Sequence, residues 1–456
     1  MAKKKGSTLY RCASCGYTQP AWLGRCPQCG EWNTLEACIA DPNAATSAIN
    51  GAGMAVKAMP VPLRTVAQEA ESRLQTGTEE FDRVLGGSHG TYGAMKRSAI
   101  LLGGEPGIGK STLLLQTAST VIARSSCTVL YVSGEESASQ IKGRAQRLNA
   151  HADSMEILCT MRLEDILDAL DSLTPALVII DSIQTVYSVQ AGLVPGTMNQ
   201  LKYCANELIG WVKERDSVLF MTAHVTKEGL IAGPKSLEHM VDTVISFEHS
   251  GDSFRFLRAA KNRFGSVDEL GIFKMDDSGL KPVADPSSLF ITRRKSGTPA
   301  GIAYVPVFEG SRVFVVEVQA LTVPAKASLS RVYSDRVDSA RINRVAAVLE
   351  KRAGIQFSDQ DLYINIAGGI RLSESAIDAA LAAALYSART DIPLPERAVV
   401  VGELSLAGEI RPVTKLKQRI KTARELGFTQ VVAPEKEDGA TAVENIKSLL
   451  SVLFKK

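Results

Sequence analysis

The fold class follows from one run of ten residues, Gly103-Gly104-Glu105-Pro106-Gly107-Ile108-Gly109-Lys110-Ser111-Thr112. A short apolar strand is predicted before it, at 99–102, and a helix is predicted to begin after it, at 113–116. The pattern Gly-x4-Gly-Lys-Ser between a strand and a helix is typical of P-loop proteins. Glycines let backbone N–H groups surround phosphates, and the positive end of the helix attracts them. The sequence therefore predicts an α/β protein that binds ATP.

The loop is expected to act together with the end of a second strand. Lys110 should reach the β- and γ-phosphates, and the Ser111 hydroxyl should bind Mg²⁺. The apolar run 176–180 ends in Asp181, a second Mg²⁺ ligand at the sheet edge where ligands gather. The nucleotide-binding residues predicted on this basis are Gly104, Glu105, Pro106, Gly107, Ile108, Gly109, Lys110, Ser111, Thr112, Asp181 and His224.

Two more predicted strands end in residues that could act on the nucleotide. The run 128–133 is followed by Glu135 and Glu136. A carboxylate there could polarise the attacking water, but position alone does not choose between the two, and a solvated pair at a helix N-terminus is the alternative. The run 218–223 ends in His224, which could sense the γ-phosphate or relay its state to the next loop. A structural histidine is an equally good interpretation.

Four cysteines near the N-terminus have the spacing of a metal site. Cys12-x-x-Cys15 is followed, after ten residues, by Cys26-x-x-Cys29. Four thiolates are the ligand set of a tetrahedral zinc site. A segment this short cannot bury a core, so the metal would supply the folding energy. We expect a zinc ribbon over residues 1–35; two redox pairs are the alternative, without the βαβ context that such pairs need.

The composition excludes several classes of protein. The chain has 456 residues, 45% hydrophobic and 22% charged, which fits a globular protein of about three domains. Its net charge is +3, so a nucleic-acid site must be a local basic patch. No run reaches the ~18–20 apolar residues of a membrane span, and no secretory signal follows the basic N-terminus. We expect a cytoplasmic protein in which residues 36–70 form a flexible linker.

Several motifs together are similar to one known family. Beside the four cysteines these are GEPGIGKST at 104–112, VIIDSIQT at 178–185, LEHMVDTV at 237–244 and KNRFG at 261–265. The chain resembles the bacterial RadA (Sms) family over essentially its whole length, and KNRFG joined to a cysteine knuckle is the most specific part of the match. The resemblance implies a RecA-like P-loop ATPase core, over residues 71–284, with ATP, Mg²⁺ and Zn²⁺ as cofactors.

The resemblance also implies a function. Members of the family form homo-hexameric rings on single-stranded and branched DNA, and act in recombinational repair through branch migration or helicase-like extension beside RecA. Glu135 aligns with the catalytic glutamate of RecA-like folds. Lys261 and Arg263 become candidates for charges that reach the neighbouring subunit's nucleotide and, with Lys110, stabilise the transferring phosphate. Without the resemblance, Lys261 and Arg263 are a basic pair on the surface.

Two glycine-containing loops are expected to face the channel of the ring. They span about 187–200 and 225–238. Mobile loops that follow nucleotide-sensing strands can move DNA as ATP turns over. Lys227 and Lys235 of the second loop are expected to contact DNA phosphates. Ordinary solvated lysines are the alternative.

Residues 285–456 are predicted to form an α+β domain that looks like the Lon protease domain. Strands are expected at 302–308 and 312–319, and an alanine-rich helix at 375–389. Lon peptidases need a serine nucleophile with a lysine base. The corresponding positions hold Ala376 and Arg419.

The missing dyad argues against proteolysis. Alanine cannot attack a peptide, and arginine is too basic to act as a general base. The nearby Ser375 and Lys417 face other directions on a helix. We expect a non-proteolytic platform for assembly and DNA binding. Its basic helix could contact the DNA backbone, or be an ordinary solvated face, through Lys415, Lys417, Arg419 and Lys421.

Three classes of function are therefore in competition. A DNA-dependent ATPase motor is favoured, and it predicts DNA-stimulated hydrolysis. A nucleotide-gated DNA-binding scaffold predicts DNA binding with negligible turnover. An ATP-dependent peptidase predicts casein cleavage that Ser375→Ala abolishes, and the missing dyad disfavours it.

Overall fold

The computed structural model of the chain divides into two compact units, Met1–Ala70 and Glu71–Lys456, which are described separately as the N-terminal unit and the main unit. The residues that the structure describes are 8–12, 18–19, 24–25, 35–39, 62–65, 72–88, 90–125, 127–150, 154–192, 194–224, 235–250, 254–283, 286–292, 294, 297–325 and 330–454.

The N-terminal unit contains a small antiparallel sheet. Its strand order is β2-β1-β3, with β1 at Thr8–Cys12, β2 at Thr18–Gln19 and β3 at Leu35–Ile39. Cys12 is the last residue of β1. The side chain of Cys12, and all of Cys15, Cys26 and Cys29, lie outside the described residues, so the predicted zinc site does too. Most of the predicted linker is also outside them, apart from part of β3 and the 3-10 turn η2, Leu63–Thr65.

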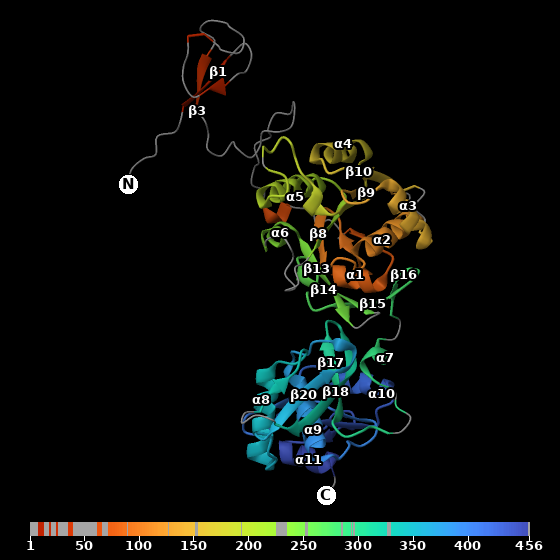
Figure 1. Cartoon of the computed structure of the whole chain (residues 1–456), viewed down its shortest axis with the longest axis vertical. Helices are drawn as coiled ribbons and strands as arrows, with labels where there is room; N and C mark the ends of the chain where they lie inside the picture. Colours follow the sequence, from red (N-terminus) through yellow and green to blue (C-terminus); the bar gives the residue numbers. More distant parts are fainter. Residues whose placement is uncertain are drawn as a thin grey trace. The chain divides into compact units, whose positions relative to one another are not determined.

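A nine-stranded sheet forms the first half of the main unit (Figure 1). Its order is β10-β9-β11-β12-β8-β13-β14-β15-β16; β10 to β13 in this order run parallel, and the last three strands are antiparallel. The strands are β8 (Ser98–Gly104), β9 (Val129–Ser133), β10 (Glu156–Cys159), β11 (Leu177–Asp181), β12 (Val218–His224), β13 (Thr243–Ser250), β14 (Phe254–Asn262), β15 (Leu270–Asp276) and β16 (Gly279–Pro282).

Helices cover both faces of this sheet. Side chains of a strand alternate between its faces, and in β8 Ile100 and Leu102 join one apolar core while Ala99 and Leu101 join the other. The first core is completed by α1 (Glu79–Leu85), α2 (Lys110–Arg124) and α3 (Ala138–Arg147), and the second by α4 (Leu163–Leu173), α5 (Met198–Lys213) and α6 (Lys235–Met240). Burial on both faces explains the unbroken apolar runs, and the four strands expected at 99–102, 128–133, 176–180 and 218–223 are confirmed as β8, β9, β11 and β12.

Residues ahead of β8 form two short hairpin-like pairs. β4 (Arg73–Leu74) pairs with β7 (Ala94–Met95), and β5 (Gly87–Ser88) pairs with β6 (Thr91–Tyr92). The segment 88–97, for which the sequence suggests no function, thus leads the chain into the P-loop strand.

A seven-stranded sheet forms the second half of the main unit, in the order β19-β20-β18-β17-β21-β24-β25. Its strands are β17 (Ile302–Glu309), β18 (Arg312–Pro324), β19 (Val332–Tyr333), β20 (Gln360–Ile366), β21 (Ala398–Val400), β24 (Gln430–Ala433) and β25 (Thr441–Ala442), and β22 (Glu403–Leu404) pairs separately with β23 (Ile410–Arg411). The strands expected at 302–308 and 312–319 are confirmed.

One alanine-rich helix lies at the centre of this second core. α9, Asp378–Thr390, begins after the 3-10 turn η6 (Ser375–Ile377), and its residues 379–384 are completely buried. Alanine lets the helix pack closely against β17 and β18. The surrounding elements are α7 (Ser287–Phe290), α8 (Ser339–Val348), η4 (Leu349–Ala353), η5 (Ala367–Gly369), α10 (Leu416–Glu425) and α11 (Ile446–Leu453).

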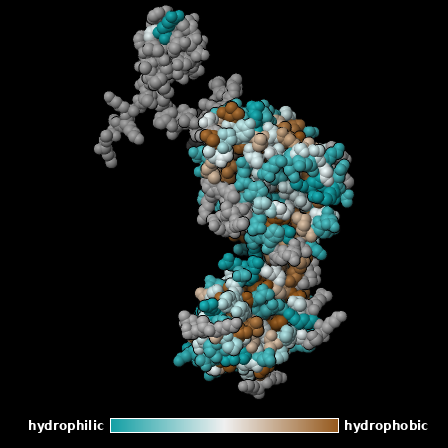
Figure 2. All heavy atoms as spheres, in the orientation of Figure 1, coloured by the Kyte–Doolittle hydropathy of each residue, from teal (hydrophilic) through white to brown (hydrophobic). Residues whose placement is uncertain are grey.

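None of the helices within the described part of the chain combines the length and the apolar character that a membrane span needs. The face shown in Figure 2 is mostly polar, with apolar residues interspersed. Such scattered apolar residues are usual on protein surfaces.

Candidate nucleotide site

The P-loop connects the end of β8 directly to the start of α2. Gly107 and Gly109 have φ angles of 77° and 115°, which residues with a Cβ rarely adopt. A Cβ on Gly109 would also lie 2.6 Å from the Met275 Cε atom. No acidic residue occupies the first turn of α2, so nothing within that turn neutralises the positive end of the helix. The loop therefore has the backbone and the charge that a phosphate group needs.

The Lys110 ammonium is held inside this loop. It donates hydrogen bonds to the backbone oxygens of Gly104, at 2.8 Å, and Glu105, at 3.0 Å. Burial lowers the pKa of Lys110, and the carboxylates of Asp181 and Glu135 act in the opposite direction. The cation is thus pre-positioned on the loop and shielded from water.

The Asp181 carboxylate is fixed by the two strands that flank β11. Tyr131 of β9 donates its hydroxyl to Oδ2 at 2.6 Å, and Thr222 of β12 donates its hydroxyl to Oδ1 at 2.7 Å. Burial raises the pKa of Tyr131 well above its ordinary value, so this hydroxyl stays protonated and remains a donor. The donor set of Asp181 and Ser111, a carboxylate and a hydroxyl, suits Mg²⁺, which prefers oxygen ligands.

Glu135 and Glu136 have different surroundings. Glu135 Oε1 accepts a hydrogen bond from the Ser182 hydroxyl at 2.7 Å and lies 3.6 Å from His224 Nε2. Glu136 instead forms an ion pair with Arg144 of α3. The structure thus places Glu135, and not Glu136, beside the ends of β11 and β12.

Gly134 is what allows this approach. A Cβ at Gly134 would lie 2.1 Å from the Thr185 hydroxyl oxygen, in the 3-10 turn η3 (Ile183–Thr185) that follows Asp181. The backbone N–H of Gly134 donates a hydrogen bond to the Asp181 carbonyl at 3.2 Å. Only glycine therefore lets the segment before Glu135 pack against the end of β11.

His224 lies between the lysine and the glutamate. Its Nδ1 is 3.5 Å from Lys110 Nζ, and its Nε2 faces Glu135. Its backbone N–H donates to the Gln184 side chain at 3.2 Å. The last residue of β12 is thus in contact with both sides of the predicted phosphate site, and the chain continues from it directly into the loop that begins at residue 225.

Lys261 and Arg263 lie elsewhere. Lys261 Nζ donates to the backbone oxygens of Glu238 and Val241 at 2.7 and 2.6 Å, and Arg263 pairs with Asp242 at 3.1 Å. In the sheet Lys261 lies opposite Val244 of β13, which in turn lies opposite Leu101 of β8. Leu101 is three residues, or about 10 Å, before the end of β8. These contacts hold both cations away from the edge of the sheet where the chain's own P-loop begins.

The two predicted DNA loops are only partly described. Lys227 and the side chain of Lys235 lie outside the described residues, although Lys235 begins α6. In the first loop Val189 and Val194 are strongly exposed. Among the described residues there is no group of three or more His, Cys, Asp or Glu side chains that could hold a metal ion.

The two positions that correspond to the protease dyad are buried and cannot be reached by a peptide substrate. Ala376 is buried, and Arg419 is 1% exposed. Arg419 forms a two-point ion pair with Glu374, at 3.0 and 2.6 Å, and donates to the Pro306 carbonyl at 2.7 Å. The expectation that Arg419 could contact DNA or lie on a solvated face is therefore wrong, because its guanidinium is used inside the fold. Lys415, Lys417 and Lys421 are exposed.

Comparison with known proteins identifies the family. The chain is 59% identical over 432 residues to the DNA repair protein RadA of Treponema pallidum, covering 94% of this chain and 92% of that protein. It is 42% identical to RadA of Bacillus subtilis, with 98% and 96% covered, and 41% identical to RadA of Pseudomonas aeruginosa over the whole of both chains. The chain belongs to the RadA family. It is thus a RadA-type DNA repair protein with an ATPase domain of the AAA/RecA-like class.

Three family models match parts of the chain. A rubredoxin metal binding domain matches residues 10–37, and an AAA domain matches residues 91–229. The model for subunit ChlI of Mg-chelatase matches residues 316–437, within the second half of the main unit. The first two matches support the zinc ribbon and the P-loop ATPase core of the RadA family.

Several residues at the site are not among those predicted from the sequence. Tyr131, Thr222 and Ser182 position the two carboxylates, and Gln184 binds the backbone of His224. Ser182 and Gln184 belong to the VIIDSIQT motif, which could have pointed to them. Tyr131 and Thr222 lie within apolar strands, where only the strand order brings them to Asp181.

Proposed function

We propose that this chain is a DNA-dependent ATPase of recombinational repair, which drives branch migration or helicase-like extension of recombination intermediates beside RecA. The observation that carries the proposal is the position of His224 between Lys110 and Glu135. One residue contacts both the phosphate-binding lysine and the proposed catalytic glutamate, and it directly precedes the proposed DNA loop. Membership of a DNA repair family supports DNA as the partner.

The proposed reaction uses the groups at the strand ends. Lys110 and the P-loop N–H groups bind the phosphates, while Ser111 and Asp181 hold Mg²⁺, which when bound offsets charge on the β- and γ-phosphates. Glu135 orients and deprotonates the attacking water, and Ser182 keeps the carboxylate in place. Loss of the γ-phosphate changes what His224 contacts, and the loop that follows it moves with the change.

The proposed assembly is a homo-hexameric ring. Lys261 and Arg263 lie away from the chain's own P-loop, so they could act on a nucleotide only in a neighbouring subunit. There they would stabilise charge on the transferring phosphate. The four cysteines are proposed to bind zinc, and Lys227 and Lys235 to contact DNA phosphates.

The second half of the main unit is proposed to be a Lon protease-like domain without protease activity, which serves assembly and DNA binding. The burial of Ala376 and the ion pair of Arg419 with Glu374 support the absence of proteolysis. We propose the domain boundaries 1–35, 36–70, 71–284 and 285–456.

The test of this function is ATP hydrolysis with and without single-stranded DNA, for the wild type and Lys261→Ala. We expect DNA to stimulate the wild type, and the variant to lose at least tenfold in kcat while it still binds DNA, because a cation on the transferring phosphate is missing. Arg411→Ala, which removes an exposed arginine, is the control and should keep its turnover. Turnover that is indifferent to DNA favours the nucleotide-gated scaffold instead.

A second prediction concerns Asp181. Tyr131→Phe should raise the Mg²⁺ concentration that gives half-maximal ATP hydrolysis by about tenfold, because groups that orient a metal ligand contribute 10–100-fold to metal affinity. Tyr92→Phe, at an exposed tyrosine, is the matched control. A Mg²⁺ titration at saturating ATP measures the effect. An unchanged Mg²⁺ requirement in Tyr131→Phe contradicts the role given to this hydroxyl.

A further inference from the structure

Strand β14 has two faces that belong to different parts of the main unit. Leu257 and Ala259 join the apolar core of the nine-stranded sheet, on the side of α2. Phe256, which points the other way, joins the core of the seven-stranded sheet. Side chains of β14 therefore contribute to both apolar cores.

The first face of β14 holds the P-loop. Arg255 is almost fully buried, and its Nε donates to the backbone oxygen of Ile108 at 3.2 Å. Ile108 lies two residues before Lys110 in the loop. The position of this part of the loop thus depends on where β14 lies.

The second face of β14 contacts the seven-stranded half. The Phe256 ring lies 6.4 Å from that of Phe290, which in turn packs against Phe314 at 5.3 Å. Arg258 pairs with Glu309, the last residue of β17, at 2.8 Å. Both contacts are made by side chains only one to three residues from Arg255.

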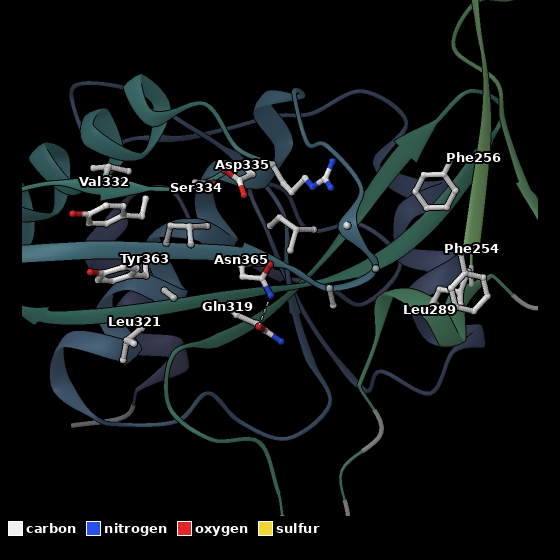
Figure 3. A pocket seen from close by; sticks show the side chains of 18 residues that line it. Phe254, Phe256, Leu289, Gln319, Leu321, Val332, Ser334, Asp335, Tyr363 and Asn365 are labelled. Carbon is white, nitrogen blue, oxygen red and sulfur yellow. Dashed lines mark hydrogen bonds between the residues drawn. The ribbon is translucent and has the colours of Figure 1, made fainter. Parts of the chain in front are cut away.

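Other groups also join the two halves near this point, since Leu270 and Ile272 of β15 belong to the same apolar core as Phe256. Beside the phenylalanines there is a pocket of about 1080 Å³, lined by Phe254, Phe256 and Leu289 and by residues of β18 to β20 such as Tyr363 (Figure 3). On the neighbouring elements, Arg312 of β18 forms a two-point ion pair with Glu80 of α1, both bonds being 3.1 Å. The ion pairs of Arg258 and Arg312 therefore add directional contacts to the apolar packing between the two halves.

We propose that β14 couples the nucleotide site to the seven-stranded half, with Arg255 as a positioning residue for the P-loop. The strand is hydrogen-bonded to β13 along most of its length and to β15 over Phe254–Arg258, so we expect Arg255 and Arg258 to move together. When a nucleotide binds, the P-loop and Arg255 shift together, and the Arg258–Glu309 pair favours the position of β14 that binds the nucleotide. By linkage, contacts of the second half then change nucleotide affinity. The inference rests on the proposed nucleotide site but not on DNA or the motor.

The test is a double-mutant cycle on nucleotide affinity in the full chain. Arg255→Met, Arg258→Met and the double variant are compared with the wild type by equilibrium binding of a fluorescent ADP analogue. Coupling energies between sites commonly correspond to 5–150-fold in affinity, so we expect Arg258→Met alone to weaken binding by at least fivefold. In the Arg255→Met background the same change should have little further effect, because the connection to Ile108 is already lost.

If each substitution only disturbs its own surroundings, the double-mutant cycle gives a different result. Arg255 and Arg258 lie about 10 Å apart on opposite faces of β14, Arg255 bonded to the Ile108 carbonyl and Arg258 to Glu309, so independent effects would multiply. Multiplicative effects, or wild-type affinity in Arg258→Met, overturn the proposal. Glu309→Gln breaks the same pair from the other side and replaces Arg258→Met if that variant does not fold. A wild type that binds no ADP analogue contradicts the proposed nucleotide site instead.

Discussion

Glu135→Gln is expected to lower kcat for ATP hydrolysis by about 10²–10⁴-fold while leaving nucleotide binding nearly unchanged. A positioned general base contributes this much to a reaction, and the amide cannot take a proton from water. The amide still accepts the hydrogen bond that Ser182 donates to Oε1, so the local structure should be retained. Single-turnover hydrolysis and equilibrium binding of ATP separate the two effects.

Glu136→Gln is the matched control, since it makes the same chemical change one residue away. Glu136 forms an ion pair with Arg144 of α3, and both side chains are partly exposed. We expect a loss of less than about tenfold, the effect of a partly exposed ion pair. If Glu136→Gln is the slower variant, or if both retain full turnover, the assignment of Glu135 is wrong.

Arg419→Ala is expected to lower the free energy of unfolding by about 3 kcal/mol. Removing one partner of a buried ion pair leaves the other without compensation, and such changes cost about 3–5 kcal/mol. Glu374 keeps some access to water, which places the effect at the low end. The carbonyl of Pro306 also loses a donor. Urea unfolding of the full chain, followed by circular dichroism, measures the change.

The control for this prediction is Arg411→Ala. Arg411 pairs with Glu409 at 3.2 Å, but both side chains are more than half exposed, and exposed pairs contribute about 0–1 kcal/mol. Equal stabilities of Arg419→Ala and Arg411→Ala would show that the buried pair is not a structural support.

The parts of the site that could be predicted from sequence are those that a continuous segment determines. The P-loop contains its own glycines, lysine and hydroxyl, and Asp181 and His224 each end an apolar run that reads as a strand. Parallel strands that end at one edge of a sheet bring such residues together without knowledge of the strand order.

What sequence reasoning missed depends on contacts between distant segments. Tyr131 reaches Asp181 only because β9 and β11 are neighbours. Arg255 reaches Ile108 across 147 residues of sequence. The choice between Glu135 and Glu136 depended on Arg144, whose position on α3 no local pattern reveals.

The same reason explains Arg419. Its sequence environment, a basic helix with lysines on either side, favoured a surface role. Glu374, which forms the ion pair with the buried Arg419, is 45 residues away in the sequence. The buried alanine-rich helix α9, in contrast, was predictable, because its small side chains lie in one continuous run.

The measurement that tests the central claim most directly is extension of a RecA-made recombination intermediate with ATP, compared between the wild type and Glu135→Gln. We predict that the wild type lengthens the paired region in one direction, and that Glu135→Gln binds the same DNA but does not lengthen it, because turnover drives the movement. Extension by the Glu135→Gln variant at the wild-type rate, or with no ATP present, would contradict a motor and favour a nucleotide-gated scaffold.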